Sequence, residues 1–518
     1  MSEPSTDTTT LLAVLQQPGT RREHLDALRT ELLALRARAV KREAAHAEEI
    51  AHVHPSRTSD AANLTHYVAL RSRDLRPLQA SLTAMGLSSL GRMESDVLGN
   101  VDAVIAMIDD ALGASDVDRP DSHHDLARER LHDAAVALLG GEPSDRVTRI
   151  MVTLPSEAAE DAAVIGDFAE AGMDLARINC AHDGPEAWAS MAAHMRAAGE
   201  DRPIAMDLAG PKVRTGPILA PESKKKGKGK KPALLVHPGD VITVTADLAP
   251  AAASDGPAHR IGCTLPEALD KVEAGHRVAF DDGKISGVVE AVRAGEIDVR
   301  VTLCAAEGTR LRAKKGINLP DSEIDVPALT AEDREALPHV VALADMVQLS
   351  FTRSAQDVRD LIAALDELSA IDARAARIGI VVKIETPSGF RALPEILLEL
   401  MRRERVGVMI ARGDLGVEVG FARLAEVQEE MLWLCEAARV PAIWATEVLA
   451  NLAATGVPSR AEVTDAAAGN RAECVMLNKG PHIPTAIRAL DDILQRMHEH
   501  TDKKRSLLRR LRAWDHDR

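Results

Sequence analysis

Eight short apolar segments, each suited to a buried strand, alternate with helical stretches from about residue 149 onward. They are Arg149–Leu154, Asp174–Asn179, Pro203–Leu208, Asp345–Ser350, Gly379–Glu385, Val406–Arg412, Pro441–Thr446 and Glu473–Asn478. A helical pattern of about ten to twenty residues follows each segment except the third. Continuous apolar character is typical of parallel strands that are buried on both faces. The pattern predicts an α/β fold, a closed (β/α)8 TIM barrel. An open doubly wound sheet is the alternative, but its frequent G-x-G-x-x-G fingerprint is absent.

Two further regions have different patterns. After the third segment, Val241–Ala246 and Ile297–Leu303 alternate apolar and polar residues, as strands of a small inserted β domain do. Near the N-terminus, apolar residues recur at helical spacing in two stripes, one from Leu25 to Ala39 and one from Val97 to Leu112. The expected organisation is a helical N-terminal extension at 1–148, a barrel at 149–216 and 319–500, an inserted β lid domain at 217–318 and a basic tail at 501–518. Within it, we expect a linker at 113–124 and a solvated loop at 224–231.

Composition limits the function classes. The net charge of −16 argues against general nucleic-acid or anionic-membrane binding, although a local cleft can still bind an anionic substrate. The five cysteines are odd in number and contain no C-x-x-C pair, which suits a reducing compartment. The N-terminus lacks a signal-peptide pattern, and no apolar run is long enough to cross a membrane. We expect a soluble, cytoplasmic protein that binds neither nucleic acid nor membrane.

Polar side chains occur where each apolar segment ends. In chain order they are Thr153, Arg177 and Asn179, Asp207, Ser350, Lys383 and Glu385, Arg412 to Asp414, Thr446, and Asn478 with Lys479. In (β/α)8 barrels the chemistry takes place at the C-terminal ends of the strands. These residues therefore predict one site that contains both cations and carboxylates.

Residue type indicates the chemistry of this site. Glu385 and Asp414 offer the hard oxygen ligands that Mg²⁺ prefers. Arg177 can hold a phosphoryl group with its planar fork, and Lys383 can act on the same group as a point charge. Backbone amides at the start of the helix after the sixth segment, with Thr446, offer a cradle for a carboxylate. This set fits a phosphorylated small acid and phosphoryl transfer.

Six motifs resemble those of the pyruvate kinase family. They are Asp174–His182 (DLARINCAH), Asp207–Gly216 (DLAGPKVRTG), Lys314–Pro320 (KKGINLP), Val382–Glu385 (VKIE), Ala411–Glu418 (ARGDLGVE) and Ala445–Leu449 (ATEVL). The resemblance covers about residues 149 to 495, which is the expected barrel with its insertion. It implies a Mg²⁺-dependent glycolytic kinase that transfers the phosphoryl group of phosphoenolpyruvate to ADP, giving pyruvate and ATP.

The resemblance also implies a role for individual residues. Arg177, Lys383 and Thr446 would be catalytic, and Lys383 would stabilise the transition state and the enolate. The substrate would contact Arg177, Ser350, Lys383, Gly413, Asp414 and Thr446. The nucleotide would contact Arg214, Lys315 and His182, while Glu385 and Asp414 would bind Mg²⁺, with Mn²⁺ as an alternative ion. The inserted domain would close as a lid and exclude water.

One departure from the family pattern concerns the monovalent cation. The family's monovalent-cation site normally uses an asparagine, a serine, an aspartate and a backbone carbonyl. Asn179 and Asp207 remain, but Ala181 stands at the serine position and the carbonyl would come from Leu208. Lys212 stands where the family usually has glutamate. Potassium-independent members carry lysine there, so the resemblance implies that K⁺ is not required and that Lys212 replaces it.

Other departures affect the edges of the site. The eighth segment leads into Asn478-Lys479-Gly480-Pro481 instead of Ser-Gly-Glu-Thr, and Ala209 replaces the lysine that normally precedes Gly-Pro. Asparagine cannot relay a proton as a hydroxyl does, so Thr446 or water would protonate the enolate. We also expect no C-terminal regulatory domain, a homo-oligomer formed through barrel faces, and an unidentified partner for the N-terminal helices.

Two alternatives to kinase activity remain. The first is a related Mg²⁺-dependent barrel enzyme that acts on another enolpyruvate or keto acid, such as an aldolase or decarboxylase. The nucleotide candidates Arg214 and Lys315 count against it. The second is a catalytically weak sensor that binds phosphoenolpyruvate or nucleotide while the N-terminal helices engage a partner, a reading that Asn478 and Lys479 favour.

Overall fold

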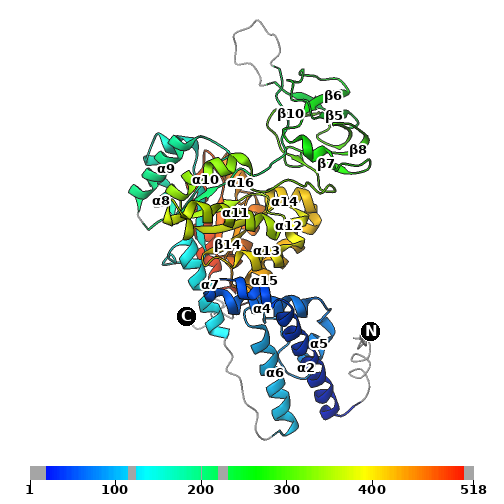
Figure 1. Ribbon diagram of the computed structural model, residues 1–518, viewed down its shortest axis with the longest axis vertical. Coiled ribbons are helices and arrows are strands. Elements are labelled where there is room, and N and C mark those ends of the chain that lie inside the picture. The colour runs from blue at the N-terminus through cyan, green and yellow to red at the C-terminus, as the bar shows by residue number, and fades with distance from the viewer. Residues whose placement is uncertain (1–18, 115–123, 200, 220–231, 504, 507–518) are drawn as a thin grey trace, which may run out of the picture.

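The computed structural model describes residues 19–114, 124–199, 201–219, 232–503 and 505–506. The expected loop at 224–231, most of the linker at 113–124 and most of the basic tail lie outside these ranges. Figure 1 shows three regions in line: the inserted domain at one end, the barrel in the middle and helices α2 to α6 at the other end. No helix in the described ranges is both long and apolar enough to span a bilayer.

Eight parallel strands close into a barrel, which confirms the predicted fold class. The strands are β1 (Arg149–Thr153), β2 (Leu175–Asn179), β3 (Ile204–Asp207), β12 (Met346–Leu349), β13 (Gly379–Ile384), β14 (Val406–Ala411), β15 (Ala442–Ala445) and β16 (Cys474–Leu477). Each lies within the segment expected for it. The strands follow chain order around the barrel, and β16 pairs with β1.

Helices cover the outside of the barrel between successive strands. They are α8 (Ala163–Ala171), α9 (Pro185–Ala198), α10 (Ala331–Leu343), α11 (Ala355–Ser369), α12 (Pro387–Arg391), α13 (Leu393–Leu400), α14 (Arg412–Val419), α15 (Phe421–Ala437), α16 (Ala450–Thr455), α17 (Arg460–Ala468) and α18 (Ile483–Met497). Capping boxes at Thr330, Ser354 and Ser459 begin α10, α11 and α17, since each side chain satisfies an otherwise unpaired amide of the first turn. After α18, β17 (Thr501–Asp502) pairs with β18 (Arg505–Ser506).

The insertion between β3 and β12 is a β domain with its own apolar core. Its strands are β4 (Leu234–Val236), β5 (Val241–Thr245), β6 (Ala258–Gly262), β7 (Arg277–Phe280), β8 (Ile285–Arg293), β9 (Glu296–Leu303), β10 (Thr309–Leu311) and β11 (Ile317–Asn318). Six of them form one sheet in the order β11-β7-β8-β9-β5-β6, and β10 pairs with β4. The chain enters and leaves through adjacent segments, because Arg214 forms an antiparallel bridge with Gly316.

The N-terminal region is helical, with α2 (Arg21–Ala45), α3 (Ala47–His52), α4 (Thr58–Arg71), α5 (Arg76–Ala84), α6 (Val97–Leu112) and α7 (His124–Leu139). The stripe predicted from Leu25 to Ala39 is buried. So is the stripe from Val97 to Ile108, whereas Leu112 is only partly buried. Helices α2 to α6 share one core cluster with the outer layer of the barrel.

Helix α7 closes the N-terminal mouth of the barrel. Its buried Ala135, Leu138 and Leu139 join a cluster with the inward-facing residues of the barrel strands. The approach requires glycine at two strand positions. A Cβ on Gly379 or Gly407 would lie 2.6 Å from a methyl carbon of Leu138, closer than atoms can pack.

Candidate active site

Asp207 lies at the centre of the C-terminal mouth of the barrel, between two cations. The Arg177 Nε donates to Asp207 Oδ2 at 2.8 Å, and the Lys383 Nζ lies 3.2 Å from the same oxygen. Ser350 links the group, because its Oγ donates to Asp207 Oδ1 at 3.0 Å and accepts from the Lys383 Nζ at 2.7 Å. The arginine also donates to Thr153 Oγ1 at 2.9 Å. Five predicted site residues from different strands are thus brought together.

The charged side chains of this cluster are buried, and opposite charges stabilise one another's charged forms. Burial opposes the charged form of Asp207, yet Lys383 and Arg177 outweigh it and hold the pKa of this carboxyl below its ordinary value. Burial likewise works against the Lys383 ammonium, but the carboxylates of Asp207 and Glu385 raise its pKa above the ordinary value. Lys383 is only 8% exposed. It is therefore a fixed positive charge inside the barrel mouth.

Glu385 and Asp414 fit a divalent cation. Burial raises the pKa of Glu385, Lys383 opposes this, and the nearby negative charge of Asp414 raises it further, so the charge of Glu385 lacks full compensation. One oxygen of Glu385 accepts from the backbone N–H of Phe351 at 2.6 Å. The described residues contain no group of three or more His, Cys, Asp and Glu side chains suited to a metal. A cation held by two carboxylates would take its other ligands from water and substrate, as Mg²⁺ does.

Two residues of the inserted domain and its entry segment hold Asp414. The Lys212 Nζ lies 2.8 Å from Asp414 Oδ2. The Asn318 Nδ2 donates to Asp414 Oδ1 at 3.3 Å and to Glu418 Oε1 at 2.9 Å. Burial raises the pKa of Glu418 to about 7, with the Asn318 hydrogen bond opposing the shift and Asp414 adding to it. Movement of the inserted domain would therefore change the surroundings of Asp414.

Several residues around the carboxylate cradle expected near Gly413 have positive backbone φ angles. The Thr446 Oγ1 accepts from the N–H of Gly413 at 2.5 Å. Thr446 has φ of 65° and Glu447 has φ of 59°, a region that residues with a Cβ rarely adopt. Phe351, whose amide binds Glu385, has φ of 54°. Backbone strain of this kind is common at functional sites, where it aims polar groups that an ordinary turn would direct elsewhere.

Arg412 has a supporting position in the structure. Its guanidinium pairs with Asp465, donates to Thr446 O at 2.6 Å and lies 4.5 Å from the centre of the Trp444 ring. These partners occupy the guanidinium, so Arg412 fixes the end of β15. Of the cations at the strand ends, Arg177 and Lys383 are the ones gathered at Asp207.

The three nucleotide candidates lie near the entry and exit of the inserted domain. Arg214 donates from Nη1 to Lys314 O at 3.4 Å, and the Lys315 Nζ lies 2.8 Å from Asp281 Oδ1. Burial lowers the pKa of His182, and the positive charges of Lys479 and Arg214 add to the effect. The rim is therefore cationic on the side where β2 and β16 end.

At the remnant monovalent-cation site, Asn179 and Asp207 are register partners on β2 and β3. The Asn179 side-chain oxygen accepts from the N–H of Ala181 at 3.0 Å, and the Leu208 carbonyl oxygen lies 2.7 Å from Ser350 Oγ. Lys212 forms its ion pair with Asp414, and the described residues show no contact from it to Asn179 or Asp207. The lysine thus brings its charge to the predicted metal site.

Four contributions were missed by reasoning from the sequence. Asn318 and Glu418 stand in two of the quoted motifs, so their position in a motif was a signal, but neither was given a role. The backbone N–H of Phe351 could not be recognised from the sequence, because the residue type does not show which backbone N–H groups point into a site. Asp333 was also missed, although its side chain accepts from the amides of Ala209 and Gly210 and fixes the turn after β3.

Comparison with known proteins agrees with this geometry. Residues 145–481 match the family model described as the pyruvate kinase barrel domain. The chain is 32% identical over 356 residues to "Pyruvate kinase 1" of Trypanosoma brucei brucei, covering 67% of this chain and 65% of that protein. It is 33% identical over 350 residues to "Pyruvate kinase PKLR" of Homo sapiens, covering 64% of this chain and 56% of the human protein. It is 30% identical over 369 residues to "Pyruvate kinase" of Corynebacterium efficiens, covering 68% and 70%.

The match thus spans slightly less than two thirds of the Trypanosoma relative and little more than half of the human one. Within this chain, the matched region contains all eight barrel strands, the inserted domain and the cluster around Asp207. On the extent of this match, the chain belongs to the pyruvate kinase family.

Proposed function

We propose that this protein transfers the phosphoryl group of phosphoenolpyruvate to ADP, with Mg²⁺, giving pyruvate and ATP. The observation that carries the proposal is the pair of buried cations on Asp207 beside the two carboxylates Glu385 and Asp414. A phosphorylated small acid needs cations for its phosphoryl group and a metal to share its charge. The family membership of the chain supports the same reaction.

In this proposal the substrate lies between the barrel strands and the carboxylate cradle. Arg177 and Lys383 hold the phosphoryl oxygens, and Ser350 orients the lysine through its 2.7 Å hydrogen bond. Backbone amides at the start of α14, with Thr446, hold the substrate carboxylate. Mg²⁺, held by Glu385 and Asp414, would supply charge neutralisation to the phosphoryl group and a fixed template for the reactants.

The phosphoryl transfer breaks the bond between phosphorus and the enol oxygen and forms one to a terminal oxygen of ADP. The enol oxygen leaves with the bonding electrons, and the ammonium of Lys383 stabilises the negative charge that develops there. The enolate then takes a proton at its methylene carbon, from Thr446 or from water. Since Asn478 offers no hydroxyl, we assign it no part in the proton transfer.

The inserted domain serves as a lid in this proposal. Arg214 and Lys315 lie where the chain enters and leaves that domain, so its closure would bring both cations to the nucleotide phosphates. Closure would also exclude water, which competes with ADP as phosphoryl acceptor. We further propose a glycolytic role in the cytoplasm and a homo-oligomer formed through barrel faces.

A coupled assay with phosphoenolpyruvate, ADP and Mg²⁺ tests the proposed function. We expect pyruvate and ATP to form in equal amounts, and none without Mg²⁺. A protein that binds phosphoenolpyruvate or nucleotide but forms no pyruvate would contradict the proposal and support the sensor. Consumption of another enolpyruvate or keto acid without nucleotide would support the aldolase-like alternative.

We expect the enzyme to work without K⁺, because the Lys212 ammonium already supplies a positive charge 2.8 Å from Asp414. The measurement is the initial rate in KCl and in tetramethylammonium chloride at constant ionic strength. Equal rates are expected for the native protein, and a dependence on K⁺ for Lys212→Glu. Strong activation of the native protein by K⁺ would refute this proposal.

Asn318→Ala is expected to weaken Mg²⁺ binding by about 10- to 100-fold, as loss of a partner that orients a metal ligand typically does. Asn318 is 3% exposed, and its amide orients Asp414. The measurement is the Mg²⁺ concentration that gives half-maximal activity, alongside calorimetric titration with MgCl₂. Asn451→Ala, at an exposed site on α16, serves as the control. An unchanged Mg²⁺ midpoint in Asn318→Ala would show that Asp414 does not depend on this contact.

A further inference from the structure

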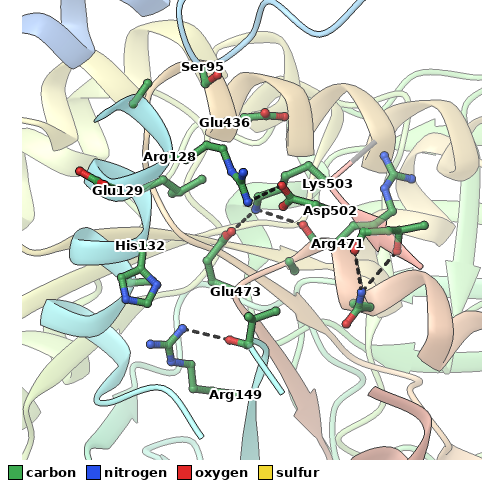
Figure 2. A pocket seen from close by; sticks show the side chains of 17 residues that line it. Ser95, Arg128, Glu129, His132, Arg149, Glu436, Arg471, Glu473, Asp502 and Lys503 are labelled. Carbon is green, nitrogen blue, oxygen red and sulfur yellow. Dashed lines mark hydrogen bonds and ion pairs between the residues drawn. The ribbon is translucent and has the colours of Figure 1, made fainter. Parts of the chain in front are cut away.

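A cavity of about 470 Å³ lies at the end of the barrel opposite the active site. Helix α7, the residues that lead into β1 and β16, and the β17 segment line it (Figure 2). Arg149 begins β1 and Thr153 ends it, so at about 3.3 Å per residue the cavity is about 13 Å or more from the catalytic rim. The kinase mechanism uses none of its residues.

Most of the charged side chains that line this cavity are neutralised by neighbours. Arg128 pairs with Asp502 at 2.8 Å, and His132 lies 3.1 Å from a carboxylate oxygen of Glu142. Lys503 pairs with Glu473, and Arg471 pairs with Glu429. The remaining acids are the exposed Glu129 and the buried Glu436, which has interactions of its own.

Arg149 is different, because within the described part of the chain it pairs with no carboxylate. It is 2% exposed, and its guanidinium donates to Gly140 O at 3.1 and 3.3 Å and to Val147 O at 3.1 Å. These three bonds leave two of the five guanidinium N–H groups available. Figure 2 shows Arg149 well apart from Glu436, Asp502 and Lys503. Burial lowers the pKa of Arg149, and the negative charges of Glu142, Glu473 and Asp174 only partly oppose the shift.

Two other polar atoms in the wall have no hydrogen-bond partner in the described structure. They are the Nε of Arg471, a donor, and the Oδ1 of Asn470, an acceptor. The orientation of the Asn470 amide follows from its neighbours, since its nitrogen faces oxygen atoms of Met497 and Thr501. Asn470 is 5% exposed. The wall of the cavity therefore contains a buried cation, whereas the unpartnered donor and acceptor are themselves buried.

We propose that this cavity binds a small organic anion, a carboxylate or a phosphate monoester. Its anionic group binds Arg149, whose planar fork matches both chemistries. An anion in this place compensates a buried guanidinium that forms no ion pair within the described part of the chain. The proposal does not depend on the proposed kinase activity.

The test is calorimetric titration of the native protein with L-malate and, separately, glycerol 3-phosphate, at constant ionic strength against chloride. Val147→Asp adds a carboxylate to the wall close to Arg149 in the chain, at a position 38% exposed, where a folded protein is expected. Val463→Asp makes the same change at a position 40% exposed on α17 and is the matched control. Arg149→Lys keeps the positive charge but loses the planar guanidinium with its paired N–H donors.

At least one probe is expected to bind the native protein, and the stronger one identifies the carboxylate or the phosphate class. Val147→Asp should raise its dissociation constant by at least about tenfold, the effect of losing one hydrogen-bonded charge contact. Val463→Asp and the active-site variant Lys383→Met should leave that constant unchanged. The proposal is overturned if neither probe binds, if Val147→Asp binds as the native protein does, or if Lys383→Met abolishes binding.

Discussion

Lys383→Met is expected to lower kcat by about 10³- to 10⁵-fold, the range for removing a cation that stabilises a phosphoryl transition state. The substitution keeps the length and apolar stem of the side chain and removes only the ammonium. That ammonium lies between Asp207, Glu385 and Ser350, where no other lysine is placed among the described residues. The KM for phosphoenolpyruvate should change less than kcat, because Arg177 continues to hold the phosphoryl group.

The coupled assay measures this effect, with Lys41→Met on the exposed face of α2 as the control. Circular dichroism and thermal unfolding should show that the Lys383 variant retains its fold, because the apolar barrel core is unchanged. Activity equal to that of the native protein would remove Lys383 from the chemistry. A parallel loss of fold and activity would require Lys383→Arg, which keeps the charge, as a second variant.

The barrel could be predicted from the sequence because its strands are buried on both faces, which leaves a continuous apolar run in each. The expected segment Gly379–Glu385 and the observed strand Gly379–Ile384 differ by one residue. The site followed from the same reasoning, since parallel strands bring their C-terminal ends to one rim. Arg177 and Lys383 therefore meet at Asp207 although they are far apart in the sequence.

Contacts between distant elements could not be predicted in this way. Leu138 of α7 packs into the N-terminal mouth of the barrel, and this packing needs glycine at positions 379 and 407. No local sequence pattern links α7 to β13 and β14. The Lys212 side chain shows the same limit. A lysine at this position suggested a replacement for K⁺. Its flexible four-carbon side chain can reach more than one carboxylate, and in the structure it pairs with Asp414.

The attachment of the N-terminal helices to the barrel depends on one buried carboxylate. Asp60 of α4 is 1% exposed and accepts hydrogen bonds from Arg57 at 3.2 Å and Arg439 at 2.8 Å, and it forms an ion pair with Arg130 at 3.0 Å. Arg439 follows α15 and also donates to the Ser95 carbonyl at 2.7 Å. The carboxylate thus joins α4 to the barrel through charge-assisted hydrogen bonds and to α7 through an ion pair.

Asp60→Ala is expected to destabilise the protein by about 3–5 kcal/mol, because it leaves buried guanidinium groups without their anion. The measurement is the midpoint of thermal and urea unfolding, together with limited proteolysis of the N-terminal helices. Asp102→Ala is the matched control, since among the described residues Asp102 of α6 pairs only with the partly exposed Arg36, and such pairs contribute at most about 1 kcal/mol. Equal losses in the two variants would contradict a joining role for Asp60. Because the active site lies at the far end of the barrel, the Asp60 variant should keep its kcat at temperatures where it stays folded.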